Sequence, residues 1–512
     1  MSAPDLRPTR VEPRSLAAIA LDLGVDSGAD LPVTGVTHDS RAVRPGDLYA
    51  GLPGARAHGA TFAAQAAERG AVALLTDRVG AELAATAQLP TIVVDDPRAV
   101  LGPVAARVYG EPSRRLRGYG VTGTNGKTTT SYLVEAGLRA AGEKTGLIGT
   151  IETRVADETV PSARTTPEAS DLQALFATMV ERGVGAVSME VSSHALALHR
   201  VDGTRFAVVA FTNLSQDHLD FHADLDDYFA AKARLFTPPF GSVGLANADD
   251  EHGRRLLARP RIETLGFSLA GAADAAWRAS DLVVDRAGSR FTAHGPAGVR
   301  VEVSTSLTGR FNAANALAAL AMLVTGGVDP VAAAAGIAAL RGVPGRLEPV
   351  EAGQPFAALV DYAHTPDAVA SMLDTLRDTL PASGRLLVVL GCGGDRDAAK
   401  RPLMGAAAAR LADVAVLTSD NPRSEDPQEI LDQVVAGAES VPAEQRGEVL
   451  VQIDRAAAIG LAVSRARAGD VLVVAGKGHE QGQEVAGVVH PFDDRTALRA
   501  ELAARGFAGA AR

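Results

Sequence analysis

Short apolar runs alternate with Ala-rich stretches of helical length along most of the chain, and this alternation limits the fold more than any other feature. Strands that alternate with helices pair in parallel, because each helix carries the chain back to the start of the next strand. The sequence therefore predicts an α/β fold with mostly parallel sheets. The predicted strands span 73–75, 91–94, 119–122, 186–189, 208–212, 358–360, 386–390, 414–418 and 471–474. Ligands of such sheets bind beyond the carboxyl ends of the strands, so the candidate site residues follow these runs.

A basic segment that contains a proline and a second segment rich in glycine and proline interrupt the alternation, and both predict hinges. They are Glu111-Pro-Ser-Arg-Arg-Leu-Arg117 and Arg341-Gly-Val-Pro-Gly-Arg346. A chain of 512 residues is also too long for one ordinary domain. The hinges divide it into a small N-terminal α/β domain (1–112), a central P-loop ATPase-like domain with a parallel sheet (113–341) and a C-terminal Rossmann-like domain (342–512).

Composition excludes several classes of protein. No run reaches the ~20 apolar residues that cross a bilayer, and the N-terminus has no apolar segment behind a basic one. The single cysteine, Cys392, excludes an internal disulfide and a thiolate metal cluster. A net charge of −11 argues against general attraction to nucleic acid. We therefore expect a cytoplasmic protein without membrane insertion and without a nucleic-acid partner.

The stretch Gly120-Val-Thr-Gly-Thr-Asn-Gly-Lys-Thr-Thr-Thr130 follows a predicted strand and precedes a helix expected over 131–141. Successive backbone N–H groups in such a loop bind phosphate oxygens, while Lys127 adds positive charge and Thr128 can ligate Mg²⁺. The match to G-x-x-x-x-G-K-[ST] is incomplete, because Val121 stands where the first glycine belongs. The alternative is a glycine-rich turn that merely opens a helix. The predicted ATP contacts are Gly123, Thr124, Asn125, Gly126, Lys127, Thr128 and Thr129.

The form G-T-N-G-K-T-T resembles the Mur ligases and the folylpolyglutamate synthetases, which are ATP-dependent enzymes that form amide bonds. Two further segments resemble motifs of the Mur ligases. They are Ser188-Met-Glu-Val-Ser-Ser-His-Ala-Leu196, and Thr212-Asn-Leu-Ser-Gln-Asp-His-Leu-Asp-Phe-His222 followed by Tyr228-Phe-Ala-Ala-Lys232.

This resemblance implies that Glu190 and His218, with Thr128, help bind Mg²⁺, and that Lys232 carries a carbamate derived from CO₂. Hard ions such as Mg²⁺ prefer oxygen ligands, which suits Glu190. A solvated lysine and a hydrogen-bonded structural histidine are the alternatives, and the latter fits His194 better than a ligand role. The predicted catalytic residues are Lys127, Glu190, His218 and Lys232.

The same resemblance supplies the remaining nucleotide contacts. Asn315, in Leu307-Thr-Gly-Arg-Phe-Asn-Ala-Ala-Asn315, matches an adenine-facing residue, although it also suits the start of an ordinary capped helix. Arg346 and Asp361 are candidates for the phosphate and the ribose. Because they belong to the C-terminal domain, we expect ATP to be clasped between the central and C-terminal domains, with compaction when the substrates bind.

The N-terminal domain resembles the uridine-nucleotide domain of Mur ligases that act on UDP-N-acetylmuramoyl peptides. The resemblance lies in Thr37-His-Asp-Ser-Arg41, Pro45-Gly-Asp-Leu-Tyr49 and Gly54-Ala-Arg-Ala-His-Gly59. A folate enzyme does not begin this way. Leu198 departs from a glutamine of some members, and surface turns or helix starts remain alternatives for single residues. The implied contacts are His38, Ser40, Ala55, Arg56, Ala57, Thr165, Thr166, Ser192 and Arg200.

Three loops after predicted strands concentrate charged residues in the C-terminal domain: Gly391-Cys-Gly-Gly-Asp-Arg-Asp397, Asp420-Asn-Pro-Arg423 and Ala475-Gly-Lys-Gly-His-Glu480. An arginine can hold a carboxylate by two hydrogen bonds, and a glutamate can receive an ammonium. D-N-P-R resembles the amino-acid motif of the Mur ligases that add meso-2,6-diaminopimelate. The implied contacts are Arg396, Asp420, Asn421, Pro422, Arg423, Gly476 and Glu480.

The resemblance as a whole implies an ADP-forming ligase of peptidoglycan synthesis. It would join meso-2,6-diaminopimelate to UDP-N-acetylmuramoyl-L-alanyl-D-glutamate through an acyl phosphate, with Mg²⁺ and ATP, and we expect a monomer. A lysine-adding ligase of the same family is the nearest alternative, since lysine lacks the second carboxylate. A non-catalytic, nucleotide-dependent scaffold is an alternative from another class, and the N-terminal domain disfavours a folylpolyglutamate synthetase.

Overall fold

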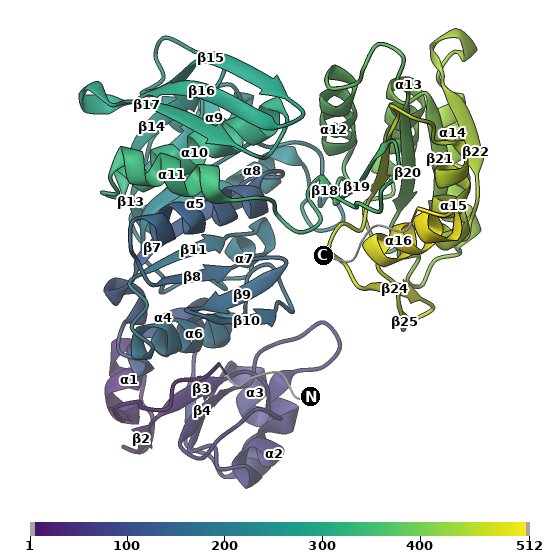
Figure 1. Ribbon diagram of the computed structural model, residues 1–512. Coiled ribbons are helices and arrows are strands. Elements are labelled where there is room, and N and C mark those ends of the chain that lie inside the picture. Colours follow the sequence, from purple (N-terminus) through teal and green to yellow (C-terminus); the bar gives the residue numbers. More distant parts are fainter. Residues whose placement is uncertain (1–5, 508–512) are drawn as a thin grey trace.

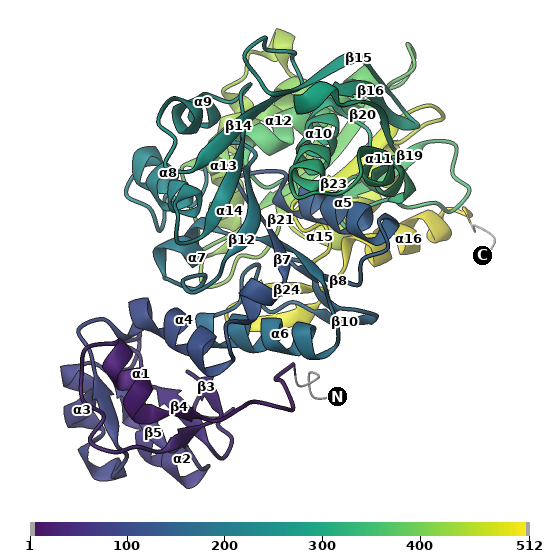
Figure 2. The same ribbon diagram turned by 90° about the vertical axis from the view of Figure 1, so that its left-hand side faces the viewer.

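The computed structural model describes residues 6–507 and contains three α/β units, each with its own main sheet (Figure 1). The first residues of the chain, which bear on the expected lack of a secretory signal, lie outside this range. In Figure 1 the N-terminal unit lies below the central unit, and the C-terminal unit lies beside the central one; Figure 2 shows the same arrangement after a quarter turn. Within residues 6–507, no helix has both the length and the apolar character needed to cross a membrane.

The N-terminal unit is a four-stranded parallel sheet with helices on both faces. Its strands, in spatial order, are β3 (Gly35–Thr37), β4 (Asp47–Ala50), β5 (Ala73–Thr76) and β6 (Thr91–Val93). Helices α1 (Leu16–Asp22) and α4 (Pro97–Val108) share one apolar cluster with α6 (Ala169–Glu181) of the central unit. The two units are therefore joined by a common core. The remaining elements are β1 (Arg14–Ser15), β2 (Pro32–Val33), α2 (Ala63–Glu68) and α3 (Arg78–Leu83).

An eleven-stranded sheet forms the central unit, and its middle is parallel. In spatial order the strands are β10 (Glu158–Pro161), β9 (Glu152–Val155), β8 (Thr145–Ile148), β11 (Ala186–Glu190), β7 (Arg117–Thr122), β12 (Phe206–Phe211), β13 (Gly241–Asn247), β14 (Glu263–Ser268), β15 (Trp277–Asp285), β16 (Gly288–His294) and β17 (Arg300–Thr305). Antiparallel pairs occur at the two ends of this sheet.

Helices cover both faces of the central sheet. One apolar cluster contains α5 (Lys127–Ala140), α10 (Arg310–Thr325) and α11 (Pro330–Ala339), and the other contains α6, α7 (Ser193–Ala197) and α8 (Leu225–Ala233). Helix α9 (Glu251–Ala258) lies against β13 and β14. The sheet is thus a buried layer whose strand ends are the accessible edges.

The C-terminal unit is a six-stranded sheet with helices on both faces. In spatial order its strands are β18 (Glu348–Pro349), β19 (Ala357–Asp361), β23 (Val471–Ala475), β20 (Leu386–Cys392), β21 (Val414–Ser419) and β22 (Glu448–Val451). All pairs are parallel except β18 with β19. The helices are α12 (Pro366–Asp378), α13 (Lys400–Leu411), α14 (Pro427–Glu439), α15 (Arg455–Arg465) and α16 (Asp494–Ala504), and a hairpin pairs β24 (Gly482–Val485) with β25 (Val488–Pro491).

The predicted α/β fold with mostly parallel sheets is confirmed, and each predicted apolar run lies in or at a strand. The helix after the phosphate loop begins at Lys127, four residues before the expected start at 131. Gly126 ends the loop with a φ of +87°, so the chain enters the helix directly after it. The predicted hinges fall between the sheets, because β7 begins at Arg117 and β18 begins at Glu348, whereas the exact domain boundaries stay predictions.

Candidate active site

A cavity of about 560 Å³ lies between the central and C-terminal units, at the carboxyl ends of their strands. Its walls combine the phosphate loop with the start of α10 and with the segment that follows β19. The predicted nucleotide residues that line it are Thr124, Asn125, Gly126, Lys127, Thr128, Thr129, Glu190, His218, Asn315, Arg346 and Asp361. Residues that the sequence placed on both sides of the second hinge therefore share one cavity.

Two glycines of the phosphate loop stand where no side chain fits. Gly123 has a φ of +147°, and a Cβ there would lie 1.9 Å from Thr212 Oγ1. Gly126 has a φ of +87°, and its Cβ would lie 2.4 Å from Asn315 Oδ1. The missing first glycine of the general pattern does not disturb this loop, since Val121 is a buried residue of β7.

Lys127 and Thr128 open α5 with their polar atoms directed at the loop and at β11. The Lys127 Nζ donates to the carbonyl oxygens of Gly123 at 2.9 Å and of Thr124 at 2.8 Å. Burial lowers the pKa of Lys127, and the negative charge of Glu190 opposes that shift. The Thr128 hydroxyl donates to Glu190 Oε2 at 2.9 Å.

Glu190 ends β11 and has a second set of donors from Thr150. The Thr150 backbone N–H donates to Oε1 at 2.8 Å, and the Thr150 hydroxyl donates to Oε2 at 3.0 Å. Two hydroxyls and one carboxylate thus gather beside the phosphate loop. This oxygen-rich set fits Mg²⁺, which takes one or two protein oxygens and completes its shell with water and phosphate.

His218 lies in the same cavity but uses different contacts. Its backbone has a φ of +56°, a left-handed conformation that non-glycine residues adopt mainly where their surroundings enforce it. Burial lowers the pKa of His218 to about 3, although Asp217, 3.4 Å away, opposes the shift. The ring is therefore neutral at physiological pH and can act as a ligand. Between residues 6 and 507, no group of three or more His, Cys, Asp or Glu side chains is arranged to hold a metal by itself.

Lys232 is almost completely buried on α8, with an exposed fraction of 1%. Its Nζ donates to the Gly123 carbonyl oxygen at 2.8 Å and lies 4.4 Å from the centre of the Tyr228 ring. Burial, and then the positive charge of Lys127, lower the pKa of Lys232 well below its ordinary value. A lysine buried to this extent beside the phosphate loop is unusual, and its burial favours the uncharged form of the amine.

An aromatic cluster supports the segment that carries His218. The His194 ring stacks on Phe221 with a centroid distance of 4.2 Å and meets His218 edge-on at 4.7 Å. His222 is buried and makes two hydrogen bonds, one between Nε2 and Ser193 Oγ at 3.0 Å and one between Nδ1 and Asp227 Oδ2 at 3.1 Å. Burial lowers the pKa of His194 to about 4, so this ring packs in its neutral form.

Asn315 and Asn312 lie one helical turn apart at the start of α10, and both line the cavity. The Asn315 amide donates to Asn312 Oδ1 at 3.3 Å, and Thr130 donates to Asn315 Oδ1 at 3.4 Å. Asn312 was not singled out from the sequence. The i, i+3 spacing of the two asparagines could have revealed it, because such residues share one face of a helix.

Arg346 and Asp361 come from the C-terminal unit. The Arg346 guanidinium donates to Thr128 Oγ1 at 3.1 Å and lies 4.5 Å from the centre of the Tyr362 ring. Asp361 accepts from the backbone N–H groups of Leu347 at 2.7 Å and Ala363 at 2.8 Å. Burial raises the pKa of Asp361, while Arg346 opposes this. Arg346 therefore reaches the phosphate loop from the other side of the cavity.

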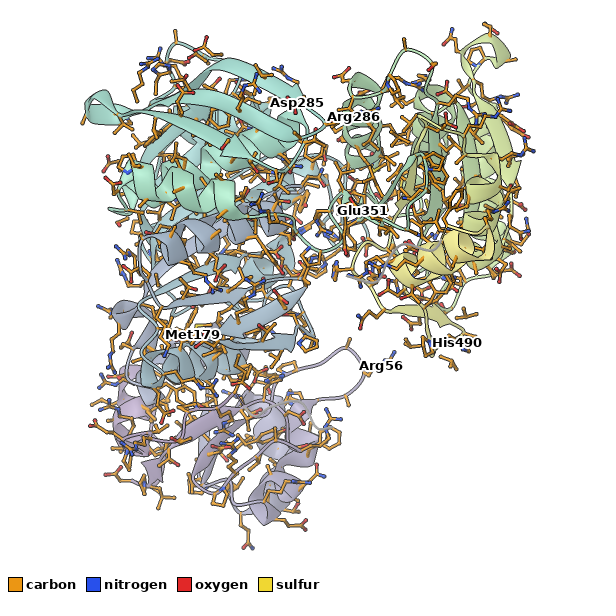
Figure 3. The ribbon with its side chains drawn as sticks, viewed as in Figure 1. Arg56, Met179, Asp285, Arg286, Glu351 and His490 are labelled. Carbon is orange, nitrogen blue, oxygen red and sulfur yellow. The ribbon has the colours of Figure 1, made fainter. Side chains whose placement is uncertain are left out.

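A second set of contacts joins the same two units. Lys400 Nζ lies 3.3 Å from Asp217 Oδ1, and Gln216 donates to Asp397 Oδ2 at 3.1 Å. Burial alone would raise the pKa of Asp217, but His218, His364 and Lys400 outweigh it and hold that pKa below its usual range. At the far end of the interface, Arg286 of the β15–β16 hairpin, labelled in Figure 3, donates to the Thr379 carbonyl oxygen at 2.7 Å.

The residues predicted to bind the UDP-sugar are divided between two places. His38 Nδ1 lies 3.0 Å from Ser170 Oγ of α6, and Ser40 donates to Gln65 Oε1 at 2.8 Å. Residues 55–57 are exposed on a loop that extends from the N-terminal unit, where Figure 3 labels Arg56. The structure thus joins His38 to the central unit but leaves this loop at the surface.

In the central unit, Thr165, Thr166 and Ser192 lie next to Glu190. Thr166 donates to the Glu190 carbonyl oxygen at 2.9 Å, and Thr165 Oγ1 lies 3.0 Å from Thr150 Oγ1. Ser192 caps α7 by accepting from the Ala195 N–H at 3.2 Å. The contacts of Thr165 and Thr166 therefore connect this group to Thr150 and Glu190, which belong to the oxygen-rich set beside the phosphate loop. Leu198 is half-buried just after α7.

Arg200 belongs to a cluster that the sequence did not reveal. The buried Glu168 carboxylate lies 3.0 Å from Arg200 Nε, 3.2 Å from Arg98 Nη1 and 3.4 Å from Arg164 Nη1. Burial lowers the pKa of Arg200, and Glu168 opposes the shift. One carboxylate thus holds guanidinium groups from both units, and the group keeps an excess of positive charge.

The three charged loops of the C-terminal unit meet at one edge of its sheet. The Gly394 N–H donates to the Asn421 carbonyl oxygen at 2.9 Å, and the Arg423 guanidinium donates to the Gly394 carbonyl oxygen. The Asn421 amide donates to Glu480 Oε2 at 2.9 Å. Arg423 has a φ of +53°, and its backbone pairs with β24 through Glu484 and Ala486.

The other residues of this predicted group differ in exposure. Asp420 and Pro422 are buried, whereas Arg396 is exposed and donates to the carbonyl oxygen of Asp395 at 2.8 Å. Gly476 has a φ of +115°, and a Cβ there would lie 2.8 Å from Asp420 Oδ2. Burial and the nearby Asp420 raise the pKa of Glu480. The contact of Arg396 thus stays within its own loop.

These features define a class of protein: a nucleotide-binding α/β enzyme whose phosphate loop faces a second domain across a cavity, with a separate α/β unit at the N-terminus. Three family models match in order along the chain: the Mur ligase family, catalytic domain (32–109), the Mur ligase middle domain (121–323), and the Mur ligase, glutamate ligase domain (345–478). The chain belongs to the Mur ligase family.

Individual relatives agree with this assignment. The chain is 59% identical, over 496 residues, to a UDP-N-acetylmuramoyl-L-alanyl-D-glutamate–2,6-diaminopimelate ligase of Streptomyces coelicolor, covering 96% of this chain and 97% of that protein. A solved structure with the same enzyme name is 32% identical, has a TM-score of 0.67 and covers 97% of this chain and 100% of its own. A MurF ligase from Thermotoga maritima in complex with ADP shares the fold, with a TM-score of 0.63, 18% identity and coverage of 92% and 99%.

Proposed function

We propose that this member of the family is an ADP-forming ligase that adds meso-2,6-diaminopimelate to UDP-N-acetylmuramoyl-L-alanyl-D-glutamate in peptidoglycan synthesis. The observation that carries the proposal is the 59% identity, across 96% of the chain, to a protein of that name. In the proposed reaction the D-glutamate carboxylate attacks the γ-phosphorus of ATP, which releases ADP and leaves an acyl phosphate. The amine of diaminopimelate, having lost a proton, then attacks the acyl carbon and expels phosphate.

The first step needs charge stabilisation rather than a protein nucleophile. Lys127 and the loop amides of residues 123–129 would hold the β- and γ-phosphates, as in other phosphate loops. Arg346 supports the same region from the opposite domain, since its guanidinium is already 3.1 Å from Thr128 Oγ1. Asn315 and Asp361 would contact the adenine and the ribose.

Mg²⁺, when bound, would offset negative charge on the phosphate oxygens, and Thr128, Glu190 and His218 are the residues that we propose to hold it. Lys232 would add CO₂ through its unprotonated amine, which is the nucleophilic form, and the lowered pKa of this buried lysine favours that form. The resulting carbamate would convert a potential cation into an anion beside the Gly123 carbonyl and the phosphate loop.

The second step requires the amino acid to be oriented at both of its ends. Arg423 and Arg396 would bind the distal carboxylate, and Glu480 would receive the distal ammonium. Asn421 would hold Glu480 in place, because its amide donates to Glu480 Oε2. Asp420, Pro422 and Gly476 shape the loops that carry them. Lysine has no distal carboxylate, so an arginine placed for that group favours diaminopimelate over lysine.

We place the UDP-muramoyl dipeptide between the N-terminal and central units. His38, Ser40 and residues 55–57 would contact the nucleotide-sugar, and Thr165, Thr166, Ser192 and Arg200 would guide the dipeptide toward Glu190. Support comes from the hydrogen bond of Thr166 to the Glu190 carbonyl oxygen, which ties this group to the phosphate loop. We further propose that the protein acts in the cytoplasm as a monomer, with domains near 1–112, 113–341 and 342–512.

Amino-acid-dependent phosphate release tests the proposal. The purified protein is given ATP, Mg²⁺ and UDP-N-acetylmuramoyl-L-alanyl-D-glutamate, with either meso-diaminopimelate or L-lysine. We expect release with diaminopimelate and little with lysine. Preference for lysine would overturn the substrate assignment, and nucleotide binding without ADP formation under full substrates would favour a scaffold.

A further inference from the structure

The side chain of Lys477 is completely buried in the loop between β23 and β24, yet none of the roles proposed above uses it. Its Nζ donates to Asn421 Oδ1 at 2.8 Å and to the Gly482 carbonyl oxygen at 2.8 Å. It also lies 3.2 Å from Asp420 Oδ1 and 3.5 Å from Glu480 Oε2. A buried ammonium is costly unless it is paired and hydrogen-bonded, and this one has a full set of partners.

These partners belong to the loops that hold the proposed diaminopimelate residues. Asp420 and Asn421 follow β21, Glu480 follows β23, and Gly482 begins β24. Lys477 is thus a buried cation at the point where these loops meet. An ammonium has three hydrogens to donate. Asn421 and Gly482 take two of them and Asp420 lies in reach of the third, so none remains for a ligand.

The contact with Asn421 also fixes the orientation of that amide. Asn421 Oδ1 accepts from Lys477 Nζ and, at 3.0 Å, from the Glu484 backbone N–H. The opposite side of the amide, Nδ2, must therefore donate, and it does so to Glu480 Oε2 at 2.9 Å. Without Lys477, one acceptor site of Asn421 and the Gly482 carbonyl oxygen would lose their donor.

The buried Lys477 also compensates the negative charge of the carboxylates around it. Burial alone would raise the pKa of Asp420, but Lys477 and Arg455 outweigh it and lower that pKa. The other charged or titratable groups around the lysine come from several elements: Glu480 in its own loop, Arg423 and Glu484 across the turn, Arg455 and Asp494 from α15 and α16, and Tyr362 and His364 after β19. Arg455 pairs directly with Asp494 at 2.7 Å, whereas Lys477 lies in direct contact with both Asp420 and Glu480.

We infer that Lys477 is a positioning residue for the amino-acid substrate: it orients Asn421 and balances Asp420, so that Glu480 stays ionised to receive the substrate ammonium. This inference rests on the proposed function. It differs from a general stabilising role because it predicts weaker binding of only one of the three substrates, the amino acid. It also differs from catalysis, since Lys477 has no free hydrogen to offer.

Steady-state kinetics of Lys477→Met test the inference against wild type and against Lys144→Met, a control whose exposed lysine donates to the Arg182 carbonyl oxygen. We expect the KM for diaminopimelate to rise about 10- to 100-fold, the factor that corresponds to an unsatisfied buried polar group. The KM values for ATP and for the UDP-muramoyl dipeptide should change much less. The acid limb of the pH profile of kcat/KM for diaminopimelate should move to higher pH. Without Lys477, Glu480 loses a cation in direct contact and stays close to the Asp420 carboxylate, and both changes raise the pKa of Glu480.

An unchanged KM for diaminopimelate would overturn the inference, and so would an equal loss for all three substrates together with a lower unfolding temperature. Should Lys477→Met fail to fold, the double variant Lys477→Met with Asp420→Asn removes the unpaired anion. It should keep the raised KM but return the acid limb to its wild-type position; a wild-type KM in this variant would contradict the role. If wild type itself shows no phosphate release with diaminopimelate, the result contradicts the proposed function, and with it the role of Lys477 that rests on it.

Discussion

The Nζ atom of Lys232 lies 2.8 Å from the carbonyl oxygen of Gly123, so a lysine of α8 contacts the first turn of the phosphate loop. Burial and the charge of Lys127 lower its pKa, which favours the uncharged amine that can add CO₂. We predict that it carries CO₂ as a carbamate. Lys232→Ala should lower kcat about 10²- to 10³-fold, the usual cost of a lost electrostatic group. Native mass spectrometry should detect one added CO₂ on wild type and none on the variant.

Chemical rescue provides the control for this prediction. A small carboxylic acid such as formate should partly restore Lys232→Ala, because it returns an anion to the vacated space, and it should not affect Lys144→Ala. Full activity of Lys232→Ala without added CO₂ or carboxylic acid would contradict the carbamate.

The contact of Lys400 with Asp217 leads to a prediction about the two domains around the cavity. Both side chains are buried, and their atoms are 3.3 Å apart across the interface. Lys400→Met should raise the KM for ATP about tenfold, because Asp217 loses a charged partner. We also expect solution scattering to show compaction of wild type when nucleotide and substrates bind, and less compaction of the variant. An unchanged KM and an equal radius of gyration for both proteins would count against a clasp.

His194 leads to a prediction about pH and stability. Its folded-state pKa is about 4, below the ordinary 6.5, because burial disfavours the charged ring. The unfolded chain therefore binds a proton that the folded protein does not bind between these values. Stability must fall as the pH drops from about 6.5 to 4, with a slope of at most ~1.4 kcal/mol per pH unit for one proton. His194→Gln should make the unfolding temperature less sensitive to pH in this window.

A matched histidine separates this effect from a general change in charge. His490 is exposed on the β24–β25 hairpin (Figure 3), so His490→Gln should leave the pH dependence as it is in wild type. Equal slopes for wild type and His194→Gln would show that the His194 ring does not titrate as its burial implies.

The strand-end loops could be found from the sequence because their signals are local. The phosphate loop lies within eleven residues, and the apolar run before it fixes its place at a strand end. Asn421 and Glu480 were likewise predicted from their own loops, and the parallel sheet brings those loops together. Asn312 was missed although its spacing from Asn315 was visible, because both residues suit an ordinary helix start.

Other parts of the site depend on contacts that no local pattern reveals. Glu168 binds Arg98 of the N-terminal unit and Arg200 beyond β11, residues separated by about a hundred positions. Lys477 lies in the segment from Ala475 to Glu480, but no pattern in these six residues predicts its complete burial. The left-handed backbone of Arg423 is likewise set by its pairing with β24, not by its identity.

The Glu168 cluster carries the last prediction, because one carboxylate there offsets three guanidinium groups. Glu168→Gln would leave Arg98, Arg164 and Arg200 to repel one another, at a cost of about 1–3 kcal/mol for a buried charge that loses its partner. We expect a lower unfolding temperature and a raised KM for the UDP-muramoyl dipeptide, because Arg200 would turn away from its predicted substrate contact, while the KM for ATP stays near that of wild type. Glu158→Gln, which breaks the more exposed pair with Arg182, is the matched control and should cost far less. If both variants behave alike, the cluster neither joins the two units nor orients Arg200.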